Sequence, residues 1–160
     1  MKTPEQEKGD RFEIFLEKRL KKKGFHNVLR NVEYHKSRYF FRQVDVSYDY
    51  IIGNRPELRI VEAKYSSNGN ISYMLRSPRE RRTEDGIIVI ENLIEEVLDK
   101  KRFTGAELAC LATNHSFEDK VKKEAEKYRI AVIEYRGKFD RQINEMQIKG
   151  RTHKNIIYLS

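Results

Sequence analysis

Residues 40–65 constrain the fold more than any other part of the chain, because they hold two strand patterns on either side of one turn. Apolar and polar side chains alternate over 40–52, which is the period of a half-buried strand. Turn-forming residues occupy 53–56, and 58–65 is a second apolar run of strand length. Two strands joined by so short a turn are predicted to form an antiparallel hairpin.

The rest of the chain predicts helices and strands that alternate. Thr3, Pro4 and Gln6 form a capping box for a helix that should end just before Gly24. The other predicted elements are a strand at 25–34, a short helix opened by a capping box at 77–80, a mostly helical segment at 87–103, a strand at 106–113, a helix at 116–128, and strands at 130–135 and 156–159. This order predicts an α/β fold, a mixed sheet with helices on both faces, built as a single domain of residues 1–160.

Charge and composition narrow the class of partner and the compartment. The chain has 33 basic and 25 acidic residues, a formal net charge of +8, which favours an anionic partner and nucleic acid before a membrane surface. It has neither an apolar run long enough to span a membrane nor an apolar N-terminal signal, so we expect an intracellular, cytoplasmic protein with no membrane partner. The single cysteine, Cys110, excludes an intrachain disulfide and is predicted to be buried.

Several kinds of chemistry find no support in the residues. The four histidines lack the spacing of zinc ligands, and one cysteine is too few for a structural zinc site. The chain has neither a phosphate-binding GxxxxGK loop nor a nucleophile elbow. The chemistry, if there is any, must come from carboxylates and lysines.

The predicted hairpin gathers such residues. Folding it about its turn brings Asp45 close to Glu62 and Lys64, which are two apart on their strand and therefore point to the same side. Asp49 shares the face of Asp45 but lies nearer the turn, so Asp45 is the preferred partner. The alternative is that these charges are ordinary cross-strand ion pairs.

A third carboxylate on the first predicted helix strengthens the case for a cation. Glu13 is in line with Leu16 and Leu20, at the edge of the apolar stripe. An acidic cluster in a basic protein suits Mg²⁺, which takes oxygen ligands and keeps several waters. The predicted ligands are the carboxylates of Asp45 and Glu62, the backbone carbonyl of Ala63 and, directly or through water, Glu13. Lys64 would orient the attacking water or stabilise charge on a phosphate.

These residues resemble a known superfamily. Asp45 followed by Glu62-Ala63-Lys64 resembles the D…(D/E)xK signature of the PD-(D/E)xK nucleases, and GDRFEIFLEKRLKKKGF resembles their first helix, with Glu13 at the recurrent acidic position. FTGAELACLATNHSFEDKVKKEAEKYRIAVIE resembles the strand-helix-strand segment of Mrr-like restriction endonucleases. The resemblance covers much of residues 9–135. Val44 replaces the proline of the signature, and Glu62 stands where Mrr-like members often have glutamine.

The resemblance implies a restriction-endonuclease-like α/β/α core and a nuclease that cleaves DNA phosphodiester bonds with Mg²⁺, for which Mn²⁺ should substitute. Basic residues near such a site would position phosphates. The predicted DNA-contacting residues are Lys21, Lys22, Lys23, His35, Lys36, Arg38, Arg76, Arg79, Arg81 and Arg82. Because cutting a duplex needs two active centres or two encounters, a homodimer is expected.

Three alternatives stay open at the level of sequence. Holliday-junction resolvases share this core and an acidic first helix, so a branched substrate would fit as well. The same fold could also serve as a DNA-binding module without catalysis. Finally, the chain could be an unrelated basic α/β protein whose charged hairpin is purely structural.

Overall fold

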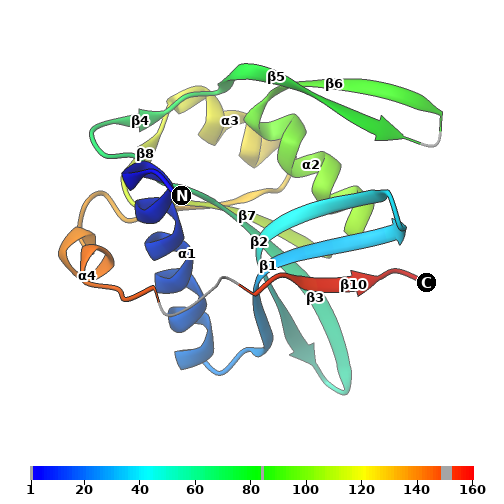
Figure 1. Ribbon diagram of the computed structural model, residues 1–160, viewed down its shortest axis with the longest axis horizontal. Helices are drawn as coiled ribbons and strands as arrows, with labels where there is room; N and C mark the ends of the chain where they lie inside the picture. Colours follow the sequence, from blue (N-terminus) through cyan, green and yellow to red (C-terminus); the bar gives the residue numbers. More distant parts are fainter. Residues whose placement is uncertain (1, 84, 149–152) are drawn as a thin grey trace.

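The chain folds around a mixed six-stranded sheet, described here from a computed structural model that covers residues 2–83, 85–148 and 153–160 (Figure 1). The helices are α1 (Pro4–Lys22), α2 (Leu93–Thr104), α3 (Asp119–Lys127) and α4 (Asp140–Asn144). The strands are β1 (His26–Ser37), β2 (Phe40–Ile52), β3 (Arg55–Lys64), β4 (Asn70–Ile71), β5 (Met74–Thr83), β6 (Gly86–Asn92), β7 (Leu108–Thr113), β8 (Ser116–Phe117), β9 (Ala131–Glu134) and β10 (Asn155–Tyr158).

The central sheet has the strand order β10-β1-β2-β3-β7-β9. β1, β2 and β3 form the antiparallel meander that the sequence predicts, while β7 and β9 add parallel strands on one side and β10 pairs parallel to β1 on the other. Two further pairs, β4 with β8 and β5 with β6, form small sheets of their own. Parallel neighbours need crossover connections, which α2 and α3 supply.

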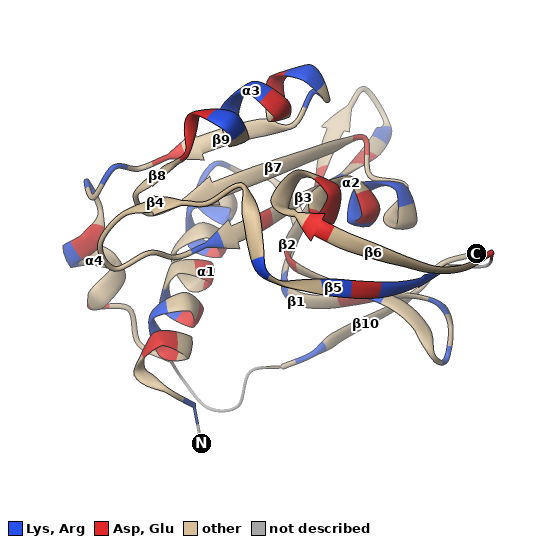
Figure 2. Ribbon diagram, turned by 90° about the horizontal axis from the view of Figure 1, so that it is seen from above, with Lys and Arg blue, Asp and Glu red and all other residues tan. Residues whose placement is uncertain are grey.

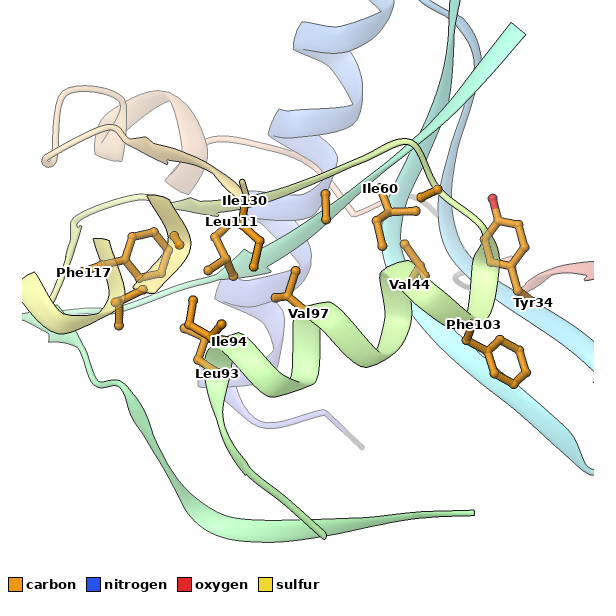
Figure 3. Packing of buried hydrophobic residues seen from close by; sticks show 14 of the residues in the cluster. Tyr34, Val44, Ile60, Leu93, Ile94, Val97, Phe103, Leu111, Phe117 and Ile130 are labelled. Carbon is orange, nitrogen blue, oxygen red and sulfur yellow. The ribbon is translucent and has the colours of Figure 1, made fainter. Parts of the chain in front are cut away.

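Helices cover both faces of the sheet, which confirms the predicted α/β class. On one face, α2 and α3 pack over the sheet through Val97, Val121, Ile60 and Leu111. Figure 3 shows Val97, Ile60 and Leu111 around α2. On the other face, α1 and α4 pack through a second cluster that contains Phe12 and Phe15. Burying apolar side chains on both sides of the central strands supplies the main stabilisation of such a layered fold.

The helix ends follow the signals read from the sequence. Thr3 caps α1 with the predicted capping box, and Gly24 follows its end with a φ of 87°, a left-handed conformation that glycine adopts without strain. Asn92 caps α2 by accepting a hydrogen bond from the backbone N–H of Glu95. This cap marks where the segment 87–103 changes from strand to helix.

Three local predictions are wrong. The helix predicted at 116–128 begins only at Asp119, because Ser116 and Phe117 form strand β8, and the other two errors concern residues 74–92. The capping-box pattern at 77–80 does not start a helix, because these residues lie in β5 of the β5–β6 hairpin. Pro78 falls within the irregular stretch of that pairing, where a missing N–H breaks no ladder bond. Residues 87–92 were expected to be mostly helical and are strand β6, so the helix is limited to α2.

Two smaller expectations can be compared with the structure. Cys110 is buried on β7, as predicted, and burial raises the pKa of its thiol to about 12, which makes it inert at neutral pH. Among the residues that the structure describes, none of the helices combines the length and the apolar character needed to cross a bilayer.

Candidate functional site

The sheet divides at Asp45, and this division creates the site. β2 pairs with β3 from Ile52 to Val46, whereas beyond that point it pairs with β1 alone. The end of β3 meanwhile continues beside β7, with Glu62 opposite Leu111. The two strands of the predicted hairpin therefore separate on one side of Asp45, and we call this place the fork.

The side chains of β2 show why the strand turns away at the fork. Val44 packs in the cluster beneath α2, whereas Val46 packs in the cluster beneath α1. Residues two apart normally share one face of a sheet, so β2 must twist strongly between them. On the neighbouring strand, Asn31 has a positive φ of 56°, an uncommon conformation that asparagine tolerates better than most residues.

Asp45 replaces the backbone hydrogen bond that is lost where the strands part. Its Oδ2 accepts a hydrogen bond of 2.8 Å from the backbone N–H of Ala63. A carboxylate held by a backbone donor has a fixed position, while its second oxygen stays available. The predicted meeting of Asp45 with the segment 62–64 is thus confirmed in this geometry.

Glu62 is deeply buried, with 1% of its surface exposed. Its Oε2 accepts a hydrogen bond of 2.9 Å from Nζ of Lys100 on α2. Its Oε1 is buried and has no hydrogen-bond partner among the residues that the structure describes. Burial, and then the charge of Asp45, raise the pKa of Glu62 to about 7, although Lys100 and Lys64 act in the opposite direction.

Lys64 is held by a second acid that also binds the β5–β6 hairpin. Its Nζ lies 3.0 Å from Oε1 of Glu96, and Nη1 of Arg79 on β5 lies 2.8 Å from the other oxygen, Oε2. Burial favours the neutral form of Glu96, but Lys64 and Lys100 outweigh it and leave the pKa of this carboxyl below its usual value. Glu96 therefore stays ionised and connects β3, α2 and β5.

Glu13 belongs to the same electrostatic group from the opposite helix. It is partly buried on α1, as its position at the edge of the apolar stripe predicts. Burial first, and then Asp45, Asp10 and Glu62, raise its pKa to about 9, whereas Arg30 lowers it. Such a strongly perturbed cluster is typical of functional sites, since each carboxyl is unfavourable beside the next without a cation.

A ready-made metal site is absent, however. Within the described ranges, no group of three or more His, Cys, Asp or Glu side chains is arranged so that it could hold a metal ion. Asp45, Glu62 and Glu13, predicted from the sequence to share one shell, thus interact electrostatically without forming a ligand set. The carbonyl of Ala63 stays a predicted ligand, on a residue that lines the cavity beside Asp45 and Glu62.

A cavity of about 530 Å³ opens at the fork. Asp45, Glu62 and Lys64 line it from the sheet, Glu96 and Lys100 from α2. The other side is lined from β5 by arginines, drawn among the blue segments of that ribbon in Figure 2. These arginines are Arg79, Arg81 and Arg82. The arrangement is an acidic floor beneath a basic wall.

Only part of the predicted DNA-contacting set lies near this cavity. Arg76 lines an adjoining cavity of about 910 Å³ that also reaches Lys64 and Arg79. Lys36 and Arg38 lie near the β1–β2 turn, where Lys36 packs over Phe103. These positions are compatible with a role at the rim.

Two of the predictions fit the structure poorly. Lys21, Lys22 and Lys23 end α1 next to His26, whose partner on β2, Asp49, lies opposite Leu58 near the far end of β3. Six residues of strand, about 20 Å at roughly 3.3 Å per residue, separate that end from Lys64. The phosphate contact predicted for His35 is disfavoured because this side chain is buried between Phe41 and Tyr158.

Sequence reasoning missed Glu96 and Lys100, although a signal was present. The two residues are four apart on α2, so they share one side of the helix. That side also carries Leu93, Val97 and Phe103, which are buried. A glutamate and a lysine within the apolar stripe of a helix indicate buried partners, and those partners are Lys64 and Glu62.

Comparisons with known proteins inform the fold alone. No protein-family model and no curated protein matches this chain. A solved structure described as the crystal structure of a protein of unknown function, AF1548, aligns with a TM-score of 0.58 and 14% sequence identity, over 87% of this chain and 71% of that one. The likeness supports the α/β architecture and carries no activity.

Proposed function

We propose that this protein is a metal-dependent endonuclease that hydrolyses DNA phosphodiester bonds at the fork. One observation carries the proposal: Asp45, Glu62 and Lys64 come together on the floor of a cavity whose other wall is rich in arginine. Anionic DNA phosphates would enter between a basic wall and an acidic floor, and this arrangement suits a phosphate only if a cation accompanies it.

The residues fit a hard divalent cation. Glu62 has a buried oxygen without a hydrogen-bond partner among the described residues, and Asp45 has one oxygen beyond the one that Ala63 binds. Mg²⁺ is usually held by one or two carboxylates, with water and phosphate oxygens completing its shell. When bound, Mg²⁺ or Mn²⁺ would polarise the phosphate and make a nearby water more acidic.

The side chains of the chain itself have separate tasks. Asp45, fixed by the backbone of Ala63, and Glu62, whose Oε2 is held by Lys100, would hold the cation with their remaining oxygens. Lys64 would donate hydrogen bonds to the phosphate. Until substrate arrives, Glu96 holds the ammonium group of Lys64 at the cavity. The arginines of β5 would hold the neighbouring phosphates.

A non-catalytic DNA-binding module is the second candidate, and a specific observation favours it. Glu62 and Lys64 are each engaged in a close ion pair, with Lys100 and Glu96. If Lys64 stays paired with Glu96 when DNA and Mg²⁺ are present, it cannot assist cleavage and the cavity would only hold phosphates.

Cleavage of supercoiled, linear, flap and four-way DNA, with Mg²⁺, with Mn²⁺ and without either, tests the proposal. We expect Asp45→Asn and Lys64→Met to lower the cleavage rate by about a hundredfold or more, as removal of one stabilising group in an active site does. Asp49→Asn is the matched control, because Asp49 lies on the same strand and binds Asn27 instead.

The outcomes separate the candidates. Full activity in Asp45→Asn would overturn the proposed site, and tight DNA binding without turnover under all metal conditions would favour the binding module. Preferred cleavage of the four-way substrate would identify a resolvase. We further propose an intracellular homodimer, which sedimentation of the protein with and without DNA would test.

A further inference from the structure

Beyond the fork, several aromatic rings are exposed on the sheet and at the β1–β2 turn. Tyr39 is 77% exposed, Tyr158 is 67% exposed and Phe41 is 40% exposed. Ile156 on β10 adds further apolar surface. Exposed apolar groups that gather in one place indicate a binding surface, whereas single exposed residues do not.

The register of three strands brings these rings together. His35 on β1 pairs with Phe41 on β2 and with Tyr158 on β10. The centroid of the His35 ring lies 4.6 Å from that of Phe41 and 5.2 Å from that of Tyr158. Phe41, His35 and Tyr158 thus form a continuous row of rings, which we call the aromatic row.

Hydrogen bonds make the middle of the aromatic row rigid. Nε2 of His35 lies 2.9 Å from a carboxylate oxygen of Glu33, and Nδ1 lies 3.1 Å from the carbonyl oxygen of Ser37. The outer rings are consequently supported by an imidazole that is held on both of its nitrogens.

The aromatic row continues into the candidate active site. Phe41 is four residues before Asp45 on β2, and Tyr39 and Phe41 both line the cavity at the fork. Arg38 lies over the ring of Tyr39, 5.2 Å from its centroid, and adds a positive charge at the outer end. A strand of DNA bound at Asp45 could therefore extend directly onto these rings.

We propose that the aromatic row binds unpaired nucleobases, so that the preferred substrate is DNA with a single-stranded segment next to the cleaved bond. The stacking rests on the proposed function only in taking DNA as the ligand, whereas the position of the cleaved bond rests on the proposed nuclease activity. Bases inside a duplex are already stacked on each other, whereas unpaired bases can stack on exposed aromatic side chains. The arginines across the cavity would hold the phosphates of the same strand.

Binding measured without cleavage provides the test. The probe is a single-stranded oligonucleotide that contains 2-aminopurine, whose fluorescence falls when the base stacks, and the buffer contains EDTA in place of Mg²⁺. We expect the full-length protein to quench the probe. The double variant Phe41→Leu/Tyr158→Leu should bind it about tenfold or more weakly, the size of a lost base–aromatic contact.

Matched variants keep the result interpretable. Tyr128→Leu removes a ring of equal exposure, 41%, at the end of α3, and should leave affinity unchanged. Phe41→Tyr keeps a ring and should bind like the wild type, which distinguishes lost stacking from a damaged fold. A blunt duplex should bind the double variant and the wild type equally.

The proposal would be overturned if the wild-type protein did not quench the probe, or if the double variant lost as much affinity for the duplex as for the single strand. It would also be overturned if sedimentation showed a dimer that the double variant abolishes, because the face would then belong to a second copy of the chain. Because EDTA prevents metal-dependent cleavage, a protein without nuclease activity could still show stacking, and a nuclease without stacking would still cleave duplex DNA.

Discussion

The two hairpins that border the cavity have the same antiparallel pairing and opposite surroundings. β2–β3 lies in the middle of the large sheet with helices on both faces, so Val46 and Ile60 are fully buried. β5–β6 is a sheet of its own that extends along one side of the molecule (Figure 1), and Ile87 and Val89 are exposed. The first hairpin is therefore held by packing and the second is free to contact a ligand.

The largest expected effect concerns the charge buried beside the first hairpin. Lys100→Met should destabilise the protein by about 3–5 kcal/mol at pH 8, because it leaves the buried carboxylate of Glu62 without its ammonium partner. The loss should be smaller at pH 6, because the pKa of Glu62, about 7 with Lys100 present, rises further without it and the carboxyl takes up a proton. Urea unfolding at the two pH values measures both.

Arg102→Met is the control for that experiment, because Arg102 is an exposed cation in the last turn of the same helix. Losing its favourable contact with the helix dipole should cost less than about 1 kcal/mol. Equal losses of stability in the two variants would mean that the Lys100–Glu62 pair stabilises the fold no more than an exposed cation does.

An isoleucine in each hairpin compares their packing directly. Ile60→Ala on β3 should cost about 2–5 kcal/mol, since the side chain is 1% exposed and its removal leaves a cavity. Ile87→Ala on β6, where the side chain is 61% exposed, should change stability by about 0.5 kcal/mol or less. A large loss for Ile87→Ala would show that β5–β6 is covered in solution, for example by a second copy.

The same contrast explains what the sequence could predict. The pattern of 40–65 identified β2 and β3 correctly, because alternation and burial agree there. On β5–β6 they disagree: the apolar run at 87–90 lies mostly on an exposed strand, and the capping-box residues at 77–80 lie in β5. A sequence pattern indicates a local preference for helix or strand. Tertiary packing decides whether the segment adopts that preferred structure.

The site shows the same limit. Asp45, Glu62 and Lys64 could be predicted because they belong to one hairpin, whose geometry follows from its turn. The ion pairs that Glu62 and Lys64 make with Lys100 and Glu96 could not, because they depend on how α2 packs across the sheet. Long-range packing of this kind leaves only a weak signal in a single sequence.

The acidic cluster at the fork makes a prediction about pH. The pKa of Glu13 is raised from 4.5 to about 9, first by burial, so between these values the folded protein holds a proton that the unfolded chain releases. Stability should therefore fall as the pH rises through this window, and Glu13 alone contributes at most about 1.4 kcal/mol per pH unit to the slope. Urea midpoints between pH 5 and about pH 9 measure the slope.

Two comparisons sharpen this prediction. Glu13→Gln should flatten the slope, while Glu7→Gln, at a half-buried position nearer the start of the same helix, should not. Added Mg²⁺ should also flatten it in the wild type if the cluster binds the ion, since the ion favours the ionised carboxyls. An unchanged slope in Glu13→Gln would remove this residue from the cluster.

Replacing the arginines of the exposed hairpin should have the smallest effect on stability. Its effect on DNA affinity should nevertheless be clear. Replacing Arg79, Arg81 and Arg82 together by alanine should change the unfolding free energy by about 1 kcal/mol or less, as for other partly exposed ion pairs. The slope of log affinity against log salt should fall by up to about 2.7, because each phosphate contact contributes about 0.9.

Three lysines provide a control of equal charge. Replacing Lys21, Lys22 and Lys23 by alanine also removes three positive charges, but at the far end of the sheet from the cavity, so the salt slope should change little. Charge alone would predict the same loss for both triple variants, whereas a site at the fork predicts a loss only for the arginines. Equal losses would mean that DNA binds over the whole basic surface and that the exposed hairpin has no special part in it.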